Sequence, residues 1–116
     1  MDNKERRKAL RVPVSIKIEG KEGRKTVGFG YARNLSENGM AIDAQALADG
    51  QSVPEMNSQV YLRFKLPKSD LVISVIAKVV RAEDSKDFPM IGVEFLSLSP
   101  EFQSEIVAFI ERSTSL

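Results

Sequence analysis

Apolar and polar residues alternate along much of the chain, which is the pattern of β-strands that bury one face. Residues 60–66 place an apolar side chain at every second position, and Pro67 then ends the segment because proline has no N–H for a strand ladder. Five further segments are predicted as strands on similar grounds: 12–19, 26–34, 40–44, 71–81 and 89–95. The pattern therefore predicts six strands.

Glycine and polar residues between these segments predict tight turns. Asn38-Gly39 predicts a hairpin between the second and third strands, because both residues tolerate positive φ. Gly28 and Gly30 within the second strand predict a β-bulge or a close approach of the backbone. Residues 44–58 are expected to form a loop that Met56 fixes to the core.

One helix is predicted near the C-terminus, at about residues 99–112. Ser99 can cap it, and Pro100 suits the first helical position. An apolar stripe at helical spacing follows, made by Phe102, Ile106, Phe109 and Ile110. Such a stripe is more typical of packing than of a cofactor site, so we expect it to cover the side or open end of a barrel. The fold class is an all-β protein with one C-terminal helix: a six-stranded antiparallel β-barrel over residues 12–116.

Composition narrows the possible functions. The chain has 116 residues, 42% of them hydrophobic, which suits one domain with a core. It has no Cys and no His, so Ser-His-Asp triads, thiol nucleophiles and Cys/His zinc sites are excluded. We expect no catalysis, no metal and no cofactor. No apolar stretch reaches the roughly 20 residues of a membrane helix, so we expect a cytoplasmic protein without membrane contact.

Charge is concentrated at the N-terminus. Residues 1–33 hold ten basic and four acidic residues, whereas the remainder holds seven and twelve. Within residues 1–11 lie Arg6, Arg7 and Arg11. The arginine fork grips phosphates and the Hoogsteen edge of guanine. We therefore expect residues 1–11 to be a flexible basic arm that binds a ligand, with a plain solvated tail as the alternative.

Two short motifs define the candidate site. Residues 7–11 have the form RxxxR, and residues 34–39 have the form (D/N)xSxxG. The second motif alone is also consistent with ordinary turn residues. Together, placed before the first and third strands, the two closely resemble the PilZ domain, a family of bacterial receptors for cyclic di-GMP. The resemblance covers nearly the whole chain, including the strand at 91–95 that precedes the helix.

The resemblance implies a binding site for cyclic di-GMP. In it, Arg7 and Arg11 would engage guanine edges and phosphates, Asn34 and Ser36 would contact a guanine edge, and Gly39 would allow close approach. Arg6 is similar to the family variant that binds an intercalated dimer of the ligand. The implied ligand-binding residues are Arg6, Arg7, Arg11, Asn34, Ser36 and Gly39. Binding would order the arm against the barrel and change a surface for an unidentified partner protein.

Two other functions remain open from the sequence. One is a small nucleic-acid-binding barrel whose basic arm grips the phosphate backbone. Its candidate stacking residues are few, namely Phe29, Tyr31 and Tyr61, which disfavours it. The other is a PilZ-like scaffold that binds no ligand and only docks partners.

Overall fold

The computed structural model describes residues 11–22, 25–43, 54–83 and 90–114. They form six strands and one helix: β1 (Val12–Glu22), β2 (Lys25–Leu35), β3 (Gly39–Asp43), β4 (Gln59–Lys65), β5 (Val72–Glu83), β6 (Met90–Ser97) and α2 (Pro100–Thr114). Each predicted strand matches an observed one, with ends that differ by at most three residues. No helix in these ranges is long and apolar enough to cross a membrane.

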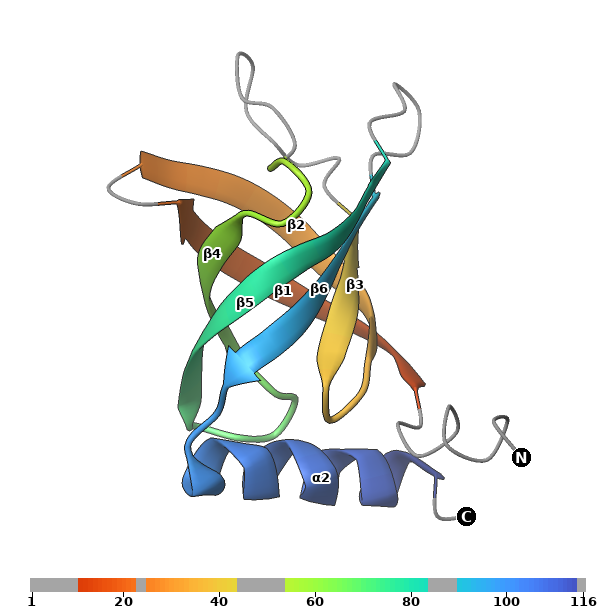
Figure 1. Ribbon diagram of the computed structural model, residues 1–116. Coiled ribbons are helices and arrows are strands. Elements are labelled where there is room, and N and C mark those ends of the chain that lie inside the picture. The colour runs from red at the N-terminus through yellow and green to blue at the C-terminus, as the bar shows by residue number, and fades with distance from the viewer. Residues whose placement is uncertain (1–10, 23–24, 44–53, 84–89, 115–116) are drawn as a thin grey trace, which may run out of the picture.

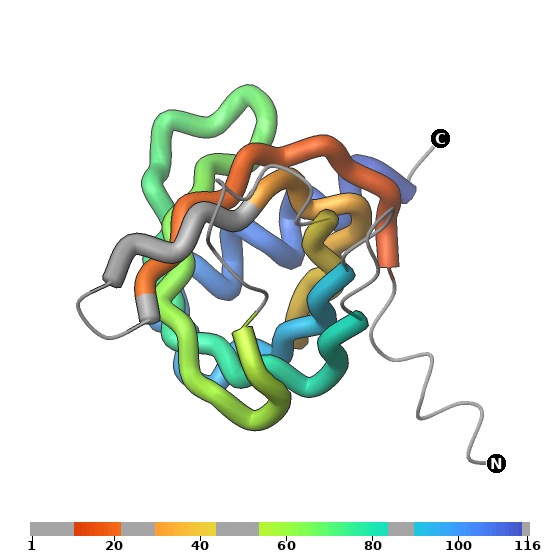
Figure 2. Tube along the Cα trace, turned by 90° about the horizontal axis from the view of Figure 1, so that it is seen from above, coloured from red at the N-terminus to blue at the C-terminus, as the bar shows by residue number. Residues whose placement is uncertain are grey.

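The strands close into an antiparallel barrel in the order β1-β2-β3-β6-β5-β4 (Figures 1 and 2). The predicted hairpin between the second and third strands is confirmed, because β2 pairs with β3 from Leu35↔Met40 to Tyr31↔Asp43. The six-stranded barrel predicted from the alternation is therefore correct.

Alternating side chains of the strands fill the barrel. In β4 the buried and exposed positions alternate without a break, as expected. The largest fully buried side chains are Leu35, Ile42, Leu62, Ile73, Ile91, Ile106, Val60, Val75 and Val79. They come from β2, β3, β4, β5, β6 and α2, so a single core holds the strands and the helix together.

Helix α2 lies across one end of the barrel (Figure 1). Its predicted stripe faces the core, where Ile106 and Ile110 are buried and the two phenylalanines pack partly buried. The Ser99 hydroxyl accepts the N–H of Phe102 at 3.2 Å, as the predicted cap requires. The Ser69 hydroxyl in the β4–β5 turn donates to a Glu105 carboxylate oxygen at 2.9 Å. The sequence left open whether the helix covers the side or an end of the barrel, and in the structure it covers an end (Figure 1).

The expected anchoring role of Met56 is wrong, since 51% of this residue is exposed. The segment before β4 is held through its backbone instead. The N–H of Asn57 donates to the Val79 carbonyl at 2.7 Å, and the N–H of Val79 donates to the Ser58 carbonyl at 2.9 Å. A single apolar residue among polar neighbours gave no periodicity from which its orientation could be inferred.

Irregular pairing interrupts the ladders at several points. Between Lys17↔Tyr31 and Glu19↔Gly28, strand β2 has one residue more than β1. This confirms the bulge predicted from Gly28 and Gly30. Further shifts occur beside Arg33 in β2 and beside Val80 in β5, and both turn side chains toward the candidate site.

Candidate functional site

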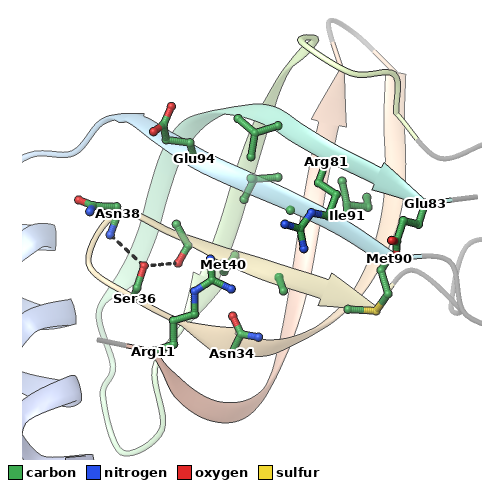
Figure 3. A pocket seen from close by; sticks show the side chains of 15 residues that line it. Arg11, Asn34, Ser36, Asn38, Met40, Arg81, Glu83, Met90, Ile91 and Glu94 are labelled. Carbon is green, nitrogen blue, oxygen red and sulfur yellow. Dashed lines mark hydrogen bonds between the residues drawn. The ribbon is translucent and has the colours of Figure 1, made fainter. Parts of the chain in front are cut away.

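A pocket of about 460 Å³ opens on the outer face of the barrel, over β3 and β6 (Figure 3). Four of the six predicted ligand residues line it: Arg11, Asn34, Ser36 and Gly39. Arg11 lies immediately before β1, and the others lie at the β2–β3 hairpin. Two segments that are more than twenty residues apart in the chain therefore meet at one pocket. The other two predicted residues, Arg6 and Arg7, and the rest of the predicted arm up to residue 10 lie outside the described residues.

Ser36 organises the hairpin that forms one wall of the pocket. It is buried, and its hydroxyl donates to the Gly39 carbonyl at 3.3 Å and accepts the N–H of Asn38 at 3.2 Å. Its own N–H also donates to the Gly39 carbonyl, at 2.9 Å. A hydroxyl has one proton and two lone pairs, so one lone pair remains for a further donor. The turn role and the binding role of Ser36 are thus compatible.

Gly39 is constrained by the neighbouring strand, and the positive φ expected from the sequence is not observed. Positive φ among described non-glycine residues occurs only at Asn57 and Lys68, and the φ of Gly39 is not in the left-handed range either. Gly39 pairs with Glu94 of β6, and a Cβ atom built on it would overlap the carbonyl oxygen of Val93. The close approach is therefore to the neighbouring strand β6, where a side chain has no room.

A β-bulge sets the direction of Asn34. The β2–β3 register runs from Ala32↔Ile42 to Asn34↔Ala41, so Arg33 is the extra residue. Ala32 and Leu35 both point into the core, whereas Arg33 and Asn34 lie on the outer side. Arg33 is held by Asp43 at 3.1 Å, while the Asn34 amide has no hydrogen bond to another described side chain or backbone group. Asn34 therefore presents an uncommitted amide to the pocket.

Arg81 is a pocket residue that sequence reasoning missed. Strict alternation along β5 places Val80 outward and Arg81 inward. A bulge at Val80, between Val79↔Val93 and Arg81↔Gly92, instead exposes both. Gly92 leaves space for the arginine, since a Cβ on Gly92 would lie 3.3 Å from the Arg81 Cβ. One signal in the sequence was available: Arg81 stands near the end of a long apolar strand. An arginine is rarely buried without a partner, so its side chain could have been expected to face outward.

The charges of the described walls are balanced. Arg11 and Arg81 extend toward the centre of the pocket from opposite sides, and the carboxylates Glu83 and Glu94 lie at its margin (Figure 3). Neither arginine forms an ion pair within the described ranges, in contrast to Arg33. Both guanidinium groups therefore keep their donors available for an anion.

Other chemistries find less support in the described residues. No group of three or more Asp or Glu residues there could hold a metal ion. Tyr31 and Tyr61 are exposed, at 43% and 42%, but neither lines the pocket. The third candidate stacking residue, Phe29, has a side chain that lies outside the described ones. The described residues that line the pocket thus provide polar and guanidinium groups and no aromatic side chain.

Comparison with known proteins gives one consistent family. The family model described as PilZ domain matches residues 5–112. Among curated proteins, none matches the chain significantly.

Solved structures agree with this match. The inhibitor of motility MotI/DgrA of Bacillus subtilis superposes with a TM-score of 0.75 at 19% identity, over 91% of this chain and 50% of its own. The PilZ domain of YcgR from Escherichia coli, solved with c-di-GMP, gives 0.71 at 16% identity, over 93% and 91%. The PilZ domain of CeSA from a cellulose-synthesizing bacterium gives 0.60 at 16% identity, over 86% and 93%. The chain thus spans only half the length of MotI/DgrA, and at these identities the likeness establishes the fold.

Proposed function

This chain belongs to the PilZ domain family, and on that premise we propose that it is a bacterial, cytoplasmic receptor for cyclic di-GMP. One observation carries the proposal. The end of the arginine-rich leader and the Asn34–Gly39 corner, which the family resemblance pairs, line the same pocket through Arg11, Asn34, Ser36 and Gly39. The YcgR structures that resemble this chain were solved with the same nucleotide.

The chemistry of the pocket suits a guanine-bearing dianion. Arg11 can engage a phosphate or the O6 and N7 acceptors of guanine with two parallel hydrogen bonds. The Ser36 hydroxyl has committed its proton to Gly39, so it would act toward the ligand as an acceptor for guanine N–H groups. The Asn34 amide can both donate and accept at a guanine edge.

The proposed arm would supply the charge that the described walls lack. The two arginines and two carboxylates of the pocket nearly cancel, so binding a dianion calls for additional cations. Arg7, and Arg6 if a dimer of the ligand binds, would provide them from residues 1–11. Because these contacts exist only in the bound arrangement, ligand binding would order the arm on the barrel. The barrel would then present a changed surface to a partner protein.

Isothermal titration calorimetry with the full chain tests this function. We expect saturable binding of cyclic di-GMP and much weaker binding of GTP and cyclic di-AMP. The adenine edge presents a donor at the position where guanine O6 accepts, so the arginine contacts would be lost with cyclic di-AMP. Binding that is indifferent to the base and falls steeply with salt would instead favour a nucleic-acid function. Absence of nucleotide binding would favour the ligand-free scaffold.

A further inference from the structure

The barrel is weakly closed on the wall opposite the pocket, where β1 meets β4. Among the described residues their pairing comprises three steps, Glu19↔Arg63, Gly20↔Leu62 and Lys21↔Tyr61. Beyond Glu19 the two strands diverge toward the end of the barrel that carries α2 (Figure 1). We call the diverging part, residues 15–17 of β1 and 64–65 at the end of β4, the β1–β4 seam. A hollow of about 510 Å³ lies there.

At the seam, two strand edges have no neighbouring strand among the described residues. Ile16 and Lys17 pair with β2 on one side, and Phe64 and Lys65 pair with β5 on the other. On the side that faces the seam, none of these four residues pairs with a strand among the described residues. Some backbone N–H and C=O groups of each edge therefore point into the hollow, where an extended segment could pair with them.

The rim of the seam is basic. Lys17, Arg63 and Lys65 are exposed and line the hollow, against the single carboxylate of Glu19. None of the three cations forms an ion pair with a described residue. The floor consists of Ile16 and Phe64, which are each only 4% exposed, and Val72 beside them is 39% exposed. The apolar surface that an incoming segment would meet is therefore provided mainly by Val72.

We propose that the β1–β4 seam is a docking site for an extended acidic peptide segment of a partner protein. An extended strand can use the free edges, the cations and the apolar floor together. A phosphate group would use only the cations. This site is separate from the nucleotide pocket, because the β1–β4 junction lies across the barrel from the β3–β6 junction.

Fluorescence anisotropy with labelled ten-residue peptides tests this proposal on the full chain without any nucleotide. A peptide of alternating glutamate and valine is expected to bind saturably, and the same peptide with lysine in place of glutamate is not. Methylating alternate backbone nitrogens of the acidic peptide is expected to weaken binding, because those N–H groups could no longer pair with a strand edge. The K17E/K65E double variant is expected to bind about ten-fold or more weakly, because two attractions become repulsions. Lys78→Glu, on β5 outside the seam, is the matched control and should bind like the unchanged chain.

The K17E/K65E variant distinguishes peptide docking from another role that lysines on strand edges have, which is to prevent aggregation. Charged residues on strand edges also prevent aggregation, and a glutamate in place of a lysine keeps a charge on the edge. If K17E/K65E stays monomeric and binds the acidic peptide as tightly as the unchanged chain, the proposal is overturned. It is also overturned if single-stranded DNA of equal charge binds the seam as tightly as the peptide, or if backbone methylation changes nothing. These outcomes do not depend on whether cyclic di-GMP binds.

Discussion

The R7A/R11A double variant is expected to bind cyclic di-GMP at least about thirty-fold more weakly than the unchanged chain. Each guanidinium lost from a guanine edge removes about 1–3 kcal/mol, so two such losses amount to at least about 2 kcal/mol. The near balance of charge in the described walls makes the loss of these two arginines more costly. Among the described lining residues, Arg81 would then be the remaining arginine beside the carboxylates Glu83 and Glu94. Calorimetric titration of both proteins with the nucleotide measures the difference.

The control for this variant is Arg63→Ala. Arg63 is an exposed arginine on β4, and it lines the opposite hollow rather than the nucleotide pocket. It should leave nucleotide affinity unchanged although it also removes a positive charge, one of the two that R7A/R11A removes. Equal weakening by Arg63→Ala would mean that net charge, rather than placement at the pocket, governs binding.

Gly39→Ala is expected to destabilise the fold and to weaken nucleotide binding together. The added methyl group would overlap the carbonyl oxygen of Val93, which belongs to the backbone of β6 and cannot rotate away as a side chain can. Relief requires that β3 and β6 separate, which weakens the ladder from Gly39↔Glu94 onward. Overpacking of this kind costs about 1–3 kcal/mol of unfolding free energy, measurable by urea denaturation.

Gly92→Ala provides the comparison for that measurement. Its added Cβ would meet the Arg81 Cβ at 3.3 Å, a tight contact with a side chain rather than with backbone. We expect it to cost less stability than Gly39→Ala. If Gly39→Ala unfolds at the same urea concentration as the unchanged chain, then β3 and β6 do not approach as closely as described.

The sequence predicted the barrel because regular alternation is a strong local signal. In β4 it gave both the extent of the strand and the side chains that face the core. The helix was equally predictable, because Ser99 supplied the cap and the apolar stripe supplied the buried face. Which end of the barrel the helix covers depends on tertiary packing, and no local pattern encodes it.

The parts of the site that could not be predicted lie at irregularities of the sheet. Arg81 enters the pocket only because a bulge at Val80 shifts the alternation by one residue. A bulge depends on pairing with a neighbouring strand, so a single strand's sequence does not show it. For Gly39 the expected positive φ is not observed, and the constraint that the structure shows comes from β6, more than fifty positions later in the chain. The close approach of a nucleotide at Gly39 stays a prediction.

At four positions the family motifs predicted pocket residues that strand alternation alone does not indicate. Arg11, Asn34, Ser36 and Gly39 were identified from two short patterns, and the structure places all four at one pocket. Residues Arg6 and Arg7 remain a prediction of the motif. Their placement determines whether the leader acts as a ligand arm or only as a basic tail.

An NMR titration of the full chain with cyclic di-GMP tests whether the N-terminal leader and residues 34–39 bind the nucleotide together, because it reports the location of binding residue by residue. We predict saturable shifts of the backbone amides of Arg11 and of residues 34–39 and 81, together with new, ordered signals from residues 6–10. Amides at Lys17 and Lys65 in the β1–β4 seam should not move. Shifts confined to the seam, or no saturable shift at millimolar nucleotide, would contradict binding of cyclic di-GMP at this pocket.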